Sequence, residues 1–160
     1  MFEISESTVS KIIVMWINFM YFQLKELDIW PSREIIDKNM PEYFQKKFPT
    51  TRVILDATEI PIQKPSDVNA QSITWSSYKH RNTLITMIGF TPKGAVSFIS
   101  ESFGGSASDR QIIECSNIIK PESNMFLPKD SIMADRGIMV QDLFAPMDVY
   151  VNTYSYHAER

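Results

Sequence analysis

The opening of the chain has the hydrophobic pattern of a helix. Ser5 is predicted as its N-cap, and apolar residues then recur at the helical spacing. The main stripe consists of Val9, Ile12, Ile13, Trp16, Ile17, Met20 and Leu24. Further apolar residues at Met15, Phe19 and Phe22 widen this stripe nearly all round the helix. We therefore expect the segment to be a buried or interface helix with partners on more than one face.

Residues 31–50 predict two shorter helices. Ser32 is placed to cap a helix that runs through Asn39. Pro41 suits the start of a second helix, which Pro49 ends. Residues 1–50 are therefore predicted to form a helical lead, separate from a domain over residues 51–160.

From residue 51 the pattern changes to short apolar runs typical of strands. Strands are predicted over residues 51–57, 82–90, 94–100, 131–135 and 148–151, with helices over 106–119 and 139–144. The second and third strands form a hairpin across the turn TPKG. The order β-β-β-α-β-α-β predicts an α/β fold with a mixed sheet, in which at least one helix-linked strand pair is parallel.

Composition narrows the classes of protein. The 160 residues suffice for one domain, and the net charge of -3 argues against a protein that coats nucleic acid by overall basic charge. The single cysteine, Cys115, excludes an intrachain disulfide and fits a reducing, intracellular setting, where we expect it to be a small buried apolar residue. The apolar run 12–22 is shorter than the roughly 20 residues that cross a membrane.

Two of the predicted strands lead into an aspartate. VILDATEI, residues 53–60, contains Asp56, and SIMADRG, residues 131–137, contains Asp135. Two carboxylates that meet at a sheet edge repel each other unless a cation lies between them, and Mg²⁺ prefers oxygen ligands. Each residue alone also suits a structural role, because Asp56 can bond locally to Thr58 and Asp135 can belong to a charged turn.

Four motifs in order carry a family resemblance: DATEIPIQKPSD, TWSSYKHRNT, FGGSASDRQI and MADRG. They resemble the DDE endonuclease domain of Harbinger-type transposases, over residues 5 to about 152. The resemblance implies a ribonuclease H-like fold, in which the first strand and the fourth strand carry catalytic aspartates. It thus implies that Asp56 and Asp135 are catalytic and bind Mg²⁺ or Mn²⁺.

The same resemblance implies a partner and a location. In that family the metal site activates water to cut DNA at transposon ends, and a freed 3′-hydroxyl then attacks target DNA. The lead STVSKIIVMW is similar to the end of the family's helix-turn-helix segment, whose first helix would precede Met1. A DNA-binding protein in the nucleus, or otherwise inside the cell, is therefore expected.

The chain departs from the family pattern after its second aspartate. The third acid should lie on a later helix, yet only residues 136–160 follow Asp135, and their acids are Asp142, Asp148 and Glu159. Asp142 and Asp148 are expected at the surface, and no helix can continue beyond Glu159. We therefore expect a truncated domain that lacks its last helix and cuts DNA weakly or not at all.

Two further expectations follow from the missing helix. The alternative function is a non-catalytic transposon relic that binds DNA or protein. The uncovered sheet face is expected to be apolar and to favour a homo-oligomer or a partner protein.

Smaller candidates surround the two aspartates. Asp109, in SASDRQI, suits a helix cap or a secondary active-site role. Lys79 and His80 belong to the basic, aromatic stretch YKHR, which suits either a solvated loop or a phosphate contact. Glu59 remains a candidate for indirect support of the metal site.

Overall fold

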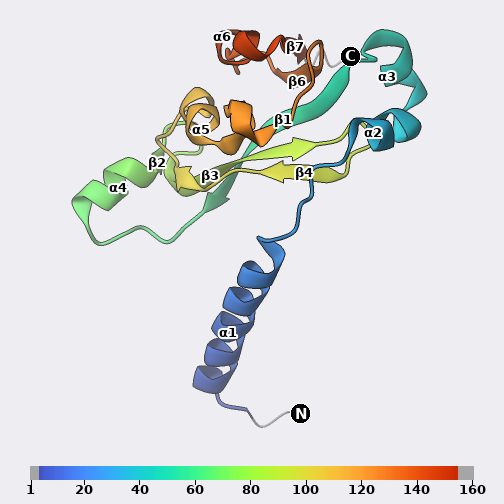
Figure 1. Ribbon diagram of the computed structural model, residues 1–160. Coiled ribbons are helices and arrows are strands. Elements are labelled where there is room, and N and C mark those ends of the chain that lie inside the picture. Colours follow the sequence, from blue (N-terminus) through green and yellow to red (C-terminus); the bar gives the residue numbers. More distant parts are fainter. Residues whose placement is uncertain (1–3, 155–160) are drawn as a thin grey trace, which may run out of the picture.

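The computed structural model describes residues 4–154 (Figure 1). The helices are α1 (Glu6–Leu24), α2 (Arg33–Asn39), α3 (Glu42–Lys47), α4 (Val68–Thr74), α5 (Asp109–Cys115) and α6 (Gln141–Phe144). The strands are β1 (Thr51–Pro61), β2 (Trp75–Ser76), β3 (Arg81–Phe90), β4 (Val96–Ile99), β5 (Phe103–Gly104), β6 (Ser131–Asp135) and β7 (Tyr150–Tyr154). Short 3₁₀ turns lie at Asn117–Ile119, Pro121–Ser123 and Ala145–Met147.

One mixed sheet forms the body of the protein. Its main path runs β2-β3-β1-β6-β7, and β4 and β5 also pair with β3. β1 is antiparallel to β3 but parallel to β6, which in turn is parallel to β7. The predicted mixed sheet is confirmed, with β1 at its centre between the hairpin strand and the SIMAD strand.

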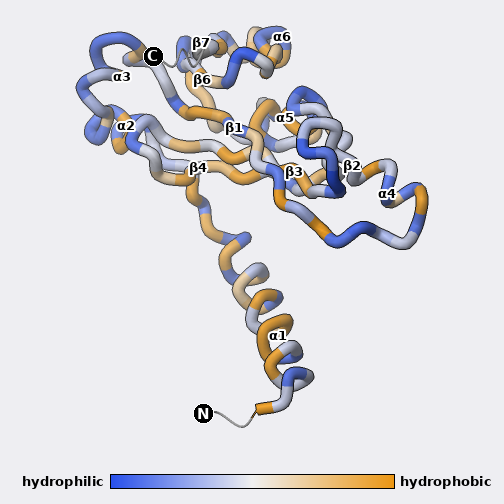
Figure 2. The backbone as a smooth tube through the Cα atoms, turned by 180° about the vertical axis from the view of Figure 1, so that it is seen from behind, coloured by the Kyte–Doolittle hydropathy of each residue, from blue (hydrophilic) through white to orange (hydrophobic). Residues whose placement is uncertain are grey.

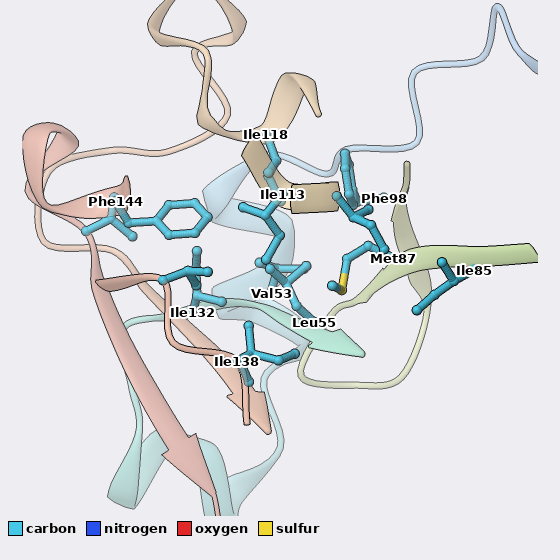
Figure 3. Close-up of a cluster of buried hydrophobic side chains, with 14 residues drawn as sticks. Val53, Leu55, Ile85, Met87, Phe98, Ile113, Ile118, Ile132, Ile138 and Phe144 are labelled. Carbon is cyan, nitrogen blue, oxygen red and sulfur yellow. The ribbon is translucent and has the colours of Figure 1, made fainter. Parts of the chain in front are cut away.

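The core lies between one face of this sheet and α5. Val53 and Leu55 of β1 are fully buried, as are Ile112 and Ile113 of α5. Figure 3 shows the labelled side chains of β1 and α5 gathered in this cluster, with Phe144 of α6 beside them. Val53 and Leu55 on β1, like Ile85 and Met87 on β3, lie two residues apart, and they point to the same side because every second residue of a strand does so.

The connector before α2 is fixed to the body by side-chain bonds. The indole Nε1 of Trp30 donates to the carbonyl of Met125 at 2.8 Å. Arg33 Nη1 donates to the buried Asp130 carboxylate at 2.8 Å. The guanidinium of Arg52 lies over the Trp30 ring, 5.0 Å from its centroid, and also donates to the carbonyl of Pro31. These contacts hold α2 and its entrance against the sheet.

Helix α1 projects from the body (Figure 1). Ser5 caps it as predicted, with Thr8 N donating to Ser5 Oγ at 3.3 Å. None of its residues is buried within the described chain, so the buried alternative is wrong, whereas the interface alternative stays a prediction. No helix among residues 4–154 is long and apolar enough to cross a membrane.

Other local predictions also need correction. β1 does not end on Asp56 but continues to Pro61, because its antiparallel pairing with β3 extends that far. The helix predicted over 106–119 is shorter, since α5 ends at Cys115 and a separate 3₁₀ turn follows. Cys115 is exposed rather than buried, because it lies on the solvent side of α5.

Candidate functional site

An open cleft of about 830 Å³ lies where the parallel ladder between β1 and β6 ends. β1, the segment after β2, the loop before α5 and the turn after β6 all contribute to its walls. The lining residues are Asp56, Ala57, Glu59, Ser76, Ser77, Tyr78, Ile85, Gly105, Ser106, Ala107, Ser108, Asp109, Arg110, Asp135, Gly137, Ile138 and Met139.

The two aspartates lie at equivalent positions of adjoining strands. The last parallel pair between β1 and β6 is Leu55 with Ala134, so Asp56 and Asp135 are each the next residue along the chain. Paired strands run about 4.8 Å apart, which brings the two backbones close together at this level. Both residues are exposed and both line the cleft. The sheet register therefore juxtaposes the two aspartates that the sequence singled out.

Their local bonds differ. Asp135 Oδ1 accepts a hydrogen bond from the backbone N of Arg136 at 2.7 Å, so part of this carboxylate stabilises the turn after β6. Asp56 makes no side-chain hydrogen bond within residues 4–154, and the local bond to Thr58 considered above does not form. The Asp56 carboxylate is consequently free to bind a ligand.

Asp109 joins the two aspartates from the start of α5. Ser108 is the side-chain cap of this helix and accepts from Gln111 N at 3.2 Å, whereas Asp109 places a negative charge in the first turn, where the helix dipole favours it. Burial raises the pKa of Asp109 above the usual value, and the negative charges of Asp56, Asp135 and Glu59 raise it further. The cleft therefore concentrates negative charge that its own side chains do not neutralise.

Glu59 is the site residue that sequence reasoning undervalued. It lies on β1 beyond Asp56, and its Oε2 accepts a hydrogen bond of 2.8 Å from Thr83 Oγ1 on β3. Thr83 is fully buried, so this bond fixes the direction of the Glu59 side chain. The signal that sequence reasoning missed was the continuation of β1 past Asp56. Residues three apart on a strand point to opposite faces, yet both Asp56 and Glu59 line the cleft.

Lys79 and His80 lie beside the cleft rather than in its wall. Both are exposed, and Lys79 Nζ lies 4.7 Å from the ring centroid of Tyr78, which does line the cleft. The backbone N of Lys79 donates to Ser76 Oγ at 3.0 Å, and His80 has a φ of 52°. These contacts form a compact basic turn that leads from β2 into β3.

The acids that follow Asp135 are not brought into the cleft. Asp142 accepts two hydrogen bonds from Arg110, of 2.8 and 2.6 Å, which lower its pKa. Asp148 is exposed and lies at a different hollow, near Met125 and Pro146. The expected surface positions of Asp142 and Asp148 are thus confirmed, whereas Glu159 lies outside the described residues.

The donor set suits a hard cation. Four carboxylates and several serine hydroxyls line the cleft, and oxygen ligands of this kind are those that Mg²⁺ and Mn²⁺ prefer. Arg110, the one base among these lining residues, is already paired with Asp142 and Glu114. Within residues 4–154, however, no three acidic, histidine or cysteine side chains converge closely enough to enclose a metal ion. Water or a substrate oxygen would have to complete the coordination.

A comparison with protein families matches the model of the DDE superfamily endonuclease over residues 55–155. The match covers more than half of the chain and contains the whole cleft. The chain therefore belongs to the DDE superfamily endonucleases, and its mixed sheet is consistent with their ribonuclease H-like fold. No curated protein and no solved structure matches the chain. The predicted family is confirmed at this level, while the Harbinger-type subgroup stays a prediction.

Proposed function

We propose that the chain is a transposase-type, divalent-metal-dependent DNA nuclease domain in which Asp56 and Asp135 are the metal-binding catalytic residues. The observation that carries the proposal is the register of β1 and β6, which sets these two aspartates side by side in an acidic cleft. The family match supports an endonuclease activity. Action on DNA in turn favours a nuclear or other intracellular location.

The ion, Mg²⁺ or Mn²⁺, would be held by Asp56 and Asp135. When bound, it would supply electrostatic stabilisation to the charge that develops on a phosphodiester. Asp109 accepts a proton more readily than an ordinary aspartate, so it suits the orientation of a water molecule beside the metal ligands. Glu59, held by Thr83, adds negative charge that favours cation binding.

DNA would approach along the basic turn beside the cleft. Lys79, His80 and Arg81 are exposed there and suit contacts with backbone phosphates, which provide affinity without sequence readout. The neighbouring Tyr78 ring lines the cleft and offers a surface for a base. The local positive charge thus offsets the repulsion that DNA would meet from the carboxylates.

We expect weak cutting by this polypeptide of 160 residues. Mg²⁺ is commonly held by one or two carboxylates together with substrate phosphates, so two aspartates can recruit one ion. A second ion across the scissile phosphate needs another well-placed ligand. Among the described residues after Asp135, Asp142 is engaged by Arg110 and Asp148 lies elsewhere.

The test combines metal binding with DNA cutting. Mn²⁺ binding is measured by electron paramagnetic resonance, and nicking is measured on supercoiled plasmid DNA with Mn²⁺. We expect weak Mn²⁺ binding that is lost in Asp56→Asn and in Asp135→Asn, together with slow nicking that disappears in both variants. Asp148→Asn is the matched control, because Asp148 is an exposed aspartate outside the cleft and asparagine tolerates its φ of 55°.

Equal Mn²⁺ binding by the wild type, Asp56→Asn and Asp135→Asn would refute the assignment of the metal site. Robust nicking that depends on both aspartates would show that the cleft suffices for catalysis without a further acid. DNA binding with no metal-dependent nicking would instead support the relic hypothesis. That alternative is favoured by one observation, namely that no three metal-binding side chains converge within the described residues.

A further inference from the structure

Helix α1 presents an unusually large apolar surface. Twelve of its 19 residues are large apolar or aromatic side chains that remain 41–63% exposed. They are Val9, Ile12, Ile13, Val14, Met15, Trp16, Ile17, Phe19, Met20, Tyr21, Phe22 and Leu24. Figure 2 shows this apolar helix extending away from the rest of the chain. A contiguous apolar surface of this size marks a site of association.

A second apolar surface lies on the sheet. Along β3, Ile85 and Met87 point into the core, so Leu84, Ile88 and Phe90 point to the opposite face. Residues from β1 and β4 extend that face through the cross-strand pairs Ile60–Leu84, Ile88–Ile99 and Phe90–Val96. Ile60, Leu84, Val96 and Ile99 are 37–59% exposed, so the described chain leaves this surface, here called the open face, largely uncovered.

The open face ends in a hollow. An apolar cavity of about 200 Å³ lies between α2 and the β3–β4 turn, with Ile29, Ile35 and Val96 among its lining residues. Such a cavity can accept a large side chain from a helix that lies on the sheet. The open face thus combines two groups of apolar residues with a recess at one end. The polar pair Thr58–Thr86 separates the two groups, and Asp56, which pairs with Ile88, lies on the same face.

Helix α1 extends from the side of the sheet that carries the open face. Figures 1 and 2 show α5 on one side and α1 extending from the other. Bonds at Trp30 and Pro31 fix the connector, which leaves only residues 26–29 between Lys25 and the first anchored residue. In the single chain α1 therefore extends away from its own sheet, and none of its residues is buried.

We propose that the protein forms a two-fold symmetric dimer in which α1 of each copy lies on the open face of the other copy. The two surfaces are similar in width and overlap in length. A helix of 19 residues is about 28 Å long and about 10 Å wide. From Leu84 to Phe90 the open face extends about 20 Å along β3, enough for about 13 residues of the helix, and three neighbouring strands span about 10 Å. When each copy places its α1 on the open face of the other, both apolar surfaces are covered in one closed assembly.

The available area is sufficient for a stable dimer. Half of the surface of a large apolar side chain is on the order of 100 Å², so six residues on one side of α1 contribute about 600 Å². The helix and the sheet both lose this area in each of two contacts, for a total of about 2,400 Å². A stable interface typically buries about 1,600 Å² in total.

The first test measures the oligomeric state by analytical ultracentrifugation. We expect the wild-type protein to be a dimer. Trp16→Glu and Ile99→Glu should each raise the Kd of the dimer by roughly 1,000-fold, because each substitution is present in both symmetric contacts and costs about 30-fold in each. Both positions are exposed in the single chain, so neither change disturbs the core. Val68→Glu is the matched control, because Val68 is an exposed apolar residue on α4 outside both surfaces, and it should remain dimeric.

The second test distinguishes reciprocal exchange from pairing of two α1 helices. A mixed dimer of Trp16→Glu with Ile99→Glu keeps one intact contact, that between wild-type α1 of the second chain and the wild-type open face of the first. Its Kd should rise by only about 30-fold, whereas each variant alone stays monomeric at the same concentration. Mixing is followed by energy transfer between dyes on Cys115, the single and exposed cysteine.

Several results would overturn the proposal. The proposal would be wrong if the wild-type chain remained monomeric at about 100 μM, for example because α1 folds onto its own sheet. Loss of the dimer in Trp16→Glu but not in Ile99→Glu would assign the contact to α1 alone. Failure of the two variants to form a mixed dimer, with both still folded by circular dichroism, would exclude the exchange. None of these measurements depends on nuclease activity.

Discussion

Gly105 lines the acidic cleft, and its replacement by alanine should strongly destabilise the folded protein. A Cβ at this position would overlap Thr83 Oγ1, and would lie 2.9 Å from the carbonyl oxygen of Thr74 and 3.2 Å from Ser76 Cβ. Thr83 is fully buried, so it cannot move into solvent to avoid the overlap. Its hydroxyl is also the donor that orients Glu59.

Two effects determine how much Gly105→Ala lowers the free energy of unfolding. Overpacking of a tightly packed site typically costs about 1–3 kcal/mol. Displacement of Thr83 would also weaken its hydrogen bond to the Glu59 carboxylate. Such bonds contribute about 1.5–3 kcal/mol, and we use the lower end because Glu59 is only half-buried. We therefore expect Gly105→Ala to lower the free energy of unfolding by about 3 kcal/mol.

The assay is urea denaturation of Gly105→Ala, with Gly137→Ala as the matched control. Gly137 lines the same cleft, but a Cβ there would meet no atom within 4 Å, so alanine should be neutral or stabilising by up to about 1 kcal/mol. Adding Thr83→Ala should reduce the cost of Gly105→Ala, with a coupling of about 1–2 kcal/mol. Equal effects at the two glycines, or additive effects of Gly105→Ala and Thr83→Ala, would refute this packing argument.

Two further predictions concern charge. Because the folded-state pKa of Asp109 is raised above 3.8, its ionised form opposes folding at neutral pH and this penalty is relieved as the pH falls through that pKa. Asp109→Asn should therefore raise Tm at pH 7, with a gain that shrinks toward pH 4; a gain that is independent of pH would contradict it. Asp130→Asn should lower the free energy of unfolding by about 3 kcal/mol in urea melts, because it leaves the buried Arg52 without its carboxylate and Arg33 with Asp37 alone. A loss under about 1 kcal/mol would show that these guanidiniums find other partners.

The local pattern of the sequence was enough to predict the main elements of the fold. Ser5 and Ser32 cap their helices because each side-chain oxygen accepts from a free N–H of the first turn. The strand at residues 131–135 was predictable from its apolar run, and the hairpin turn from Gly94, whose φ of 94° suits glycine. The central place of β1, in contrast, has no signal in the periodicity of its own residues, because it depends on pairing with both β3 and β6.

Long-range packing was harder to predict. β2 and β5 are two-residue strands that exist only because they pair with β3, and so short a stretch has no periodicity of its own. The apolar stripe of α1 predicted a helix correctly but not what would cover it, since a stripe carries no information about its partner. The division of the chain at residue 50 likewise stays a prediction.

The two aspartates show most clearly what a sequence can and cannot locate. Asp135 does end its strand, whereas Asp56 lies within β1, which stays paired with β3 as far as Pro61. The feature that they share is the end of the parallel ladder, one residue beyond the Leu55–Ala134 pair, and that feature belongs to two strands together. Neither strand alone specifies it. The same extension of β1 carries Glu59 to Thr83, so the error about the strand end and the underestimate of Glu59 have a single physical cause.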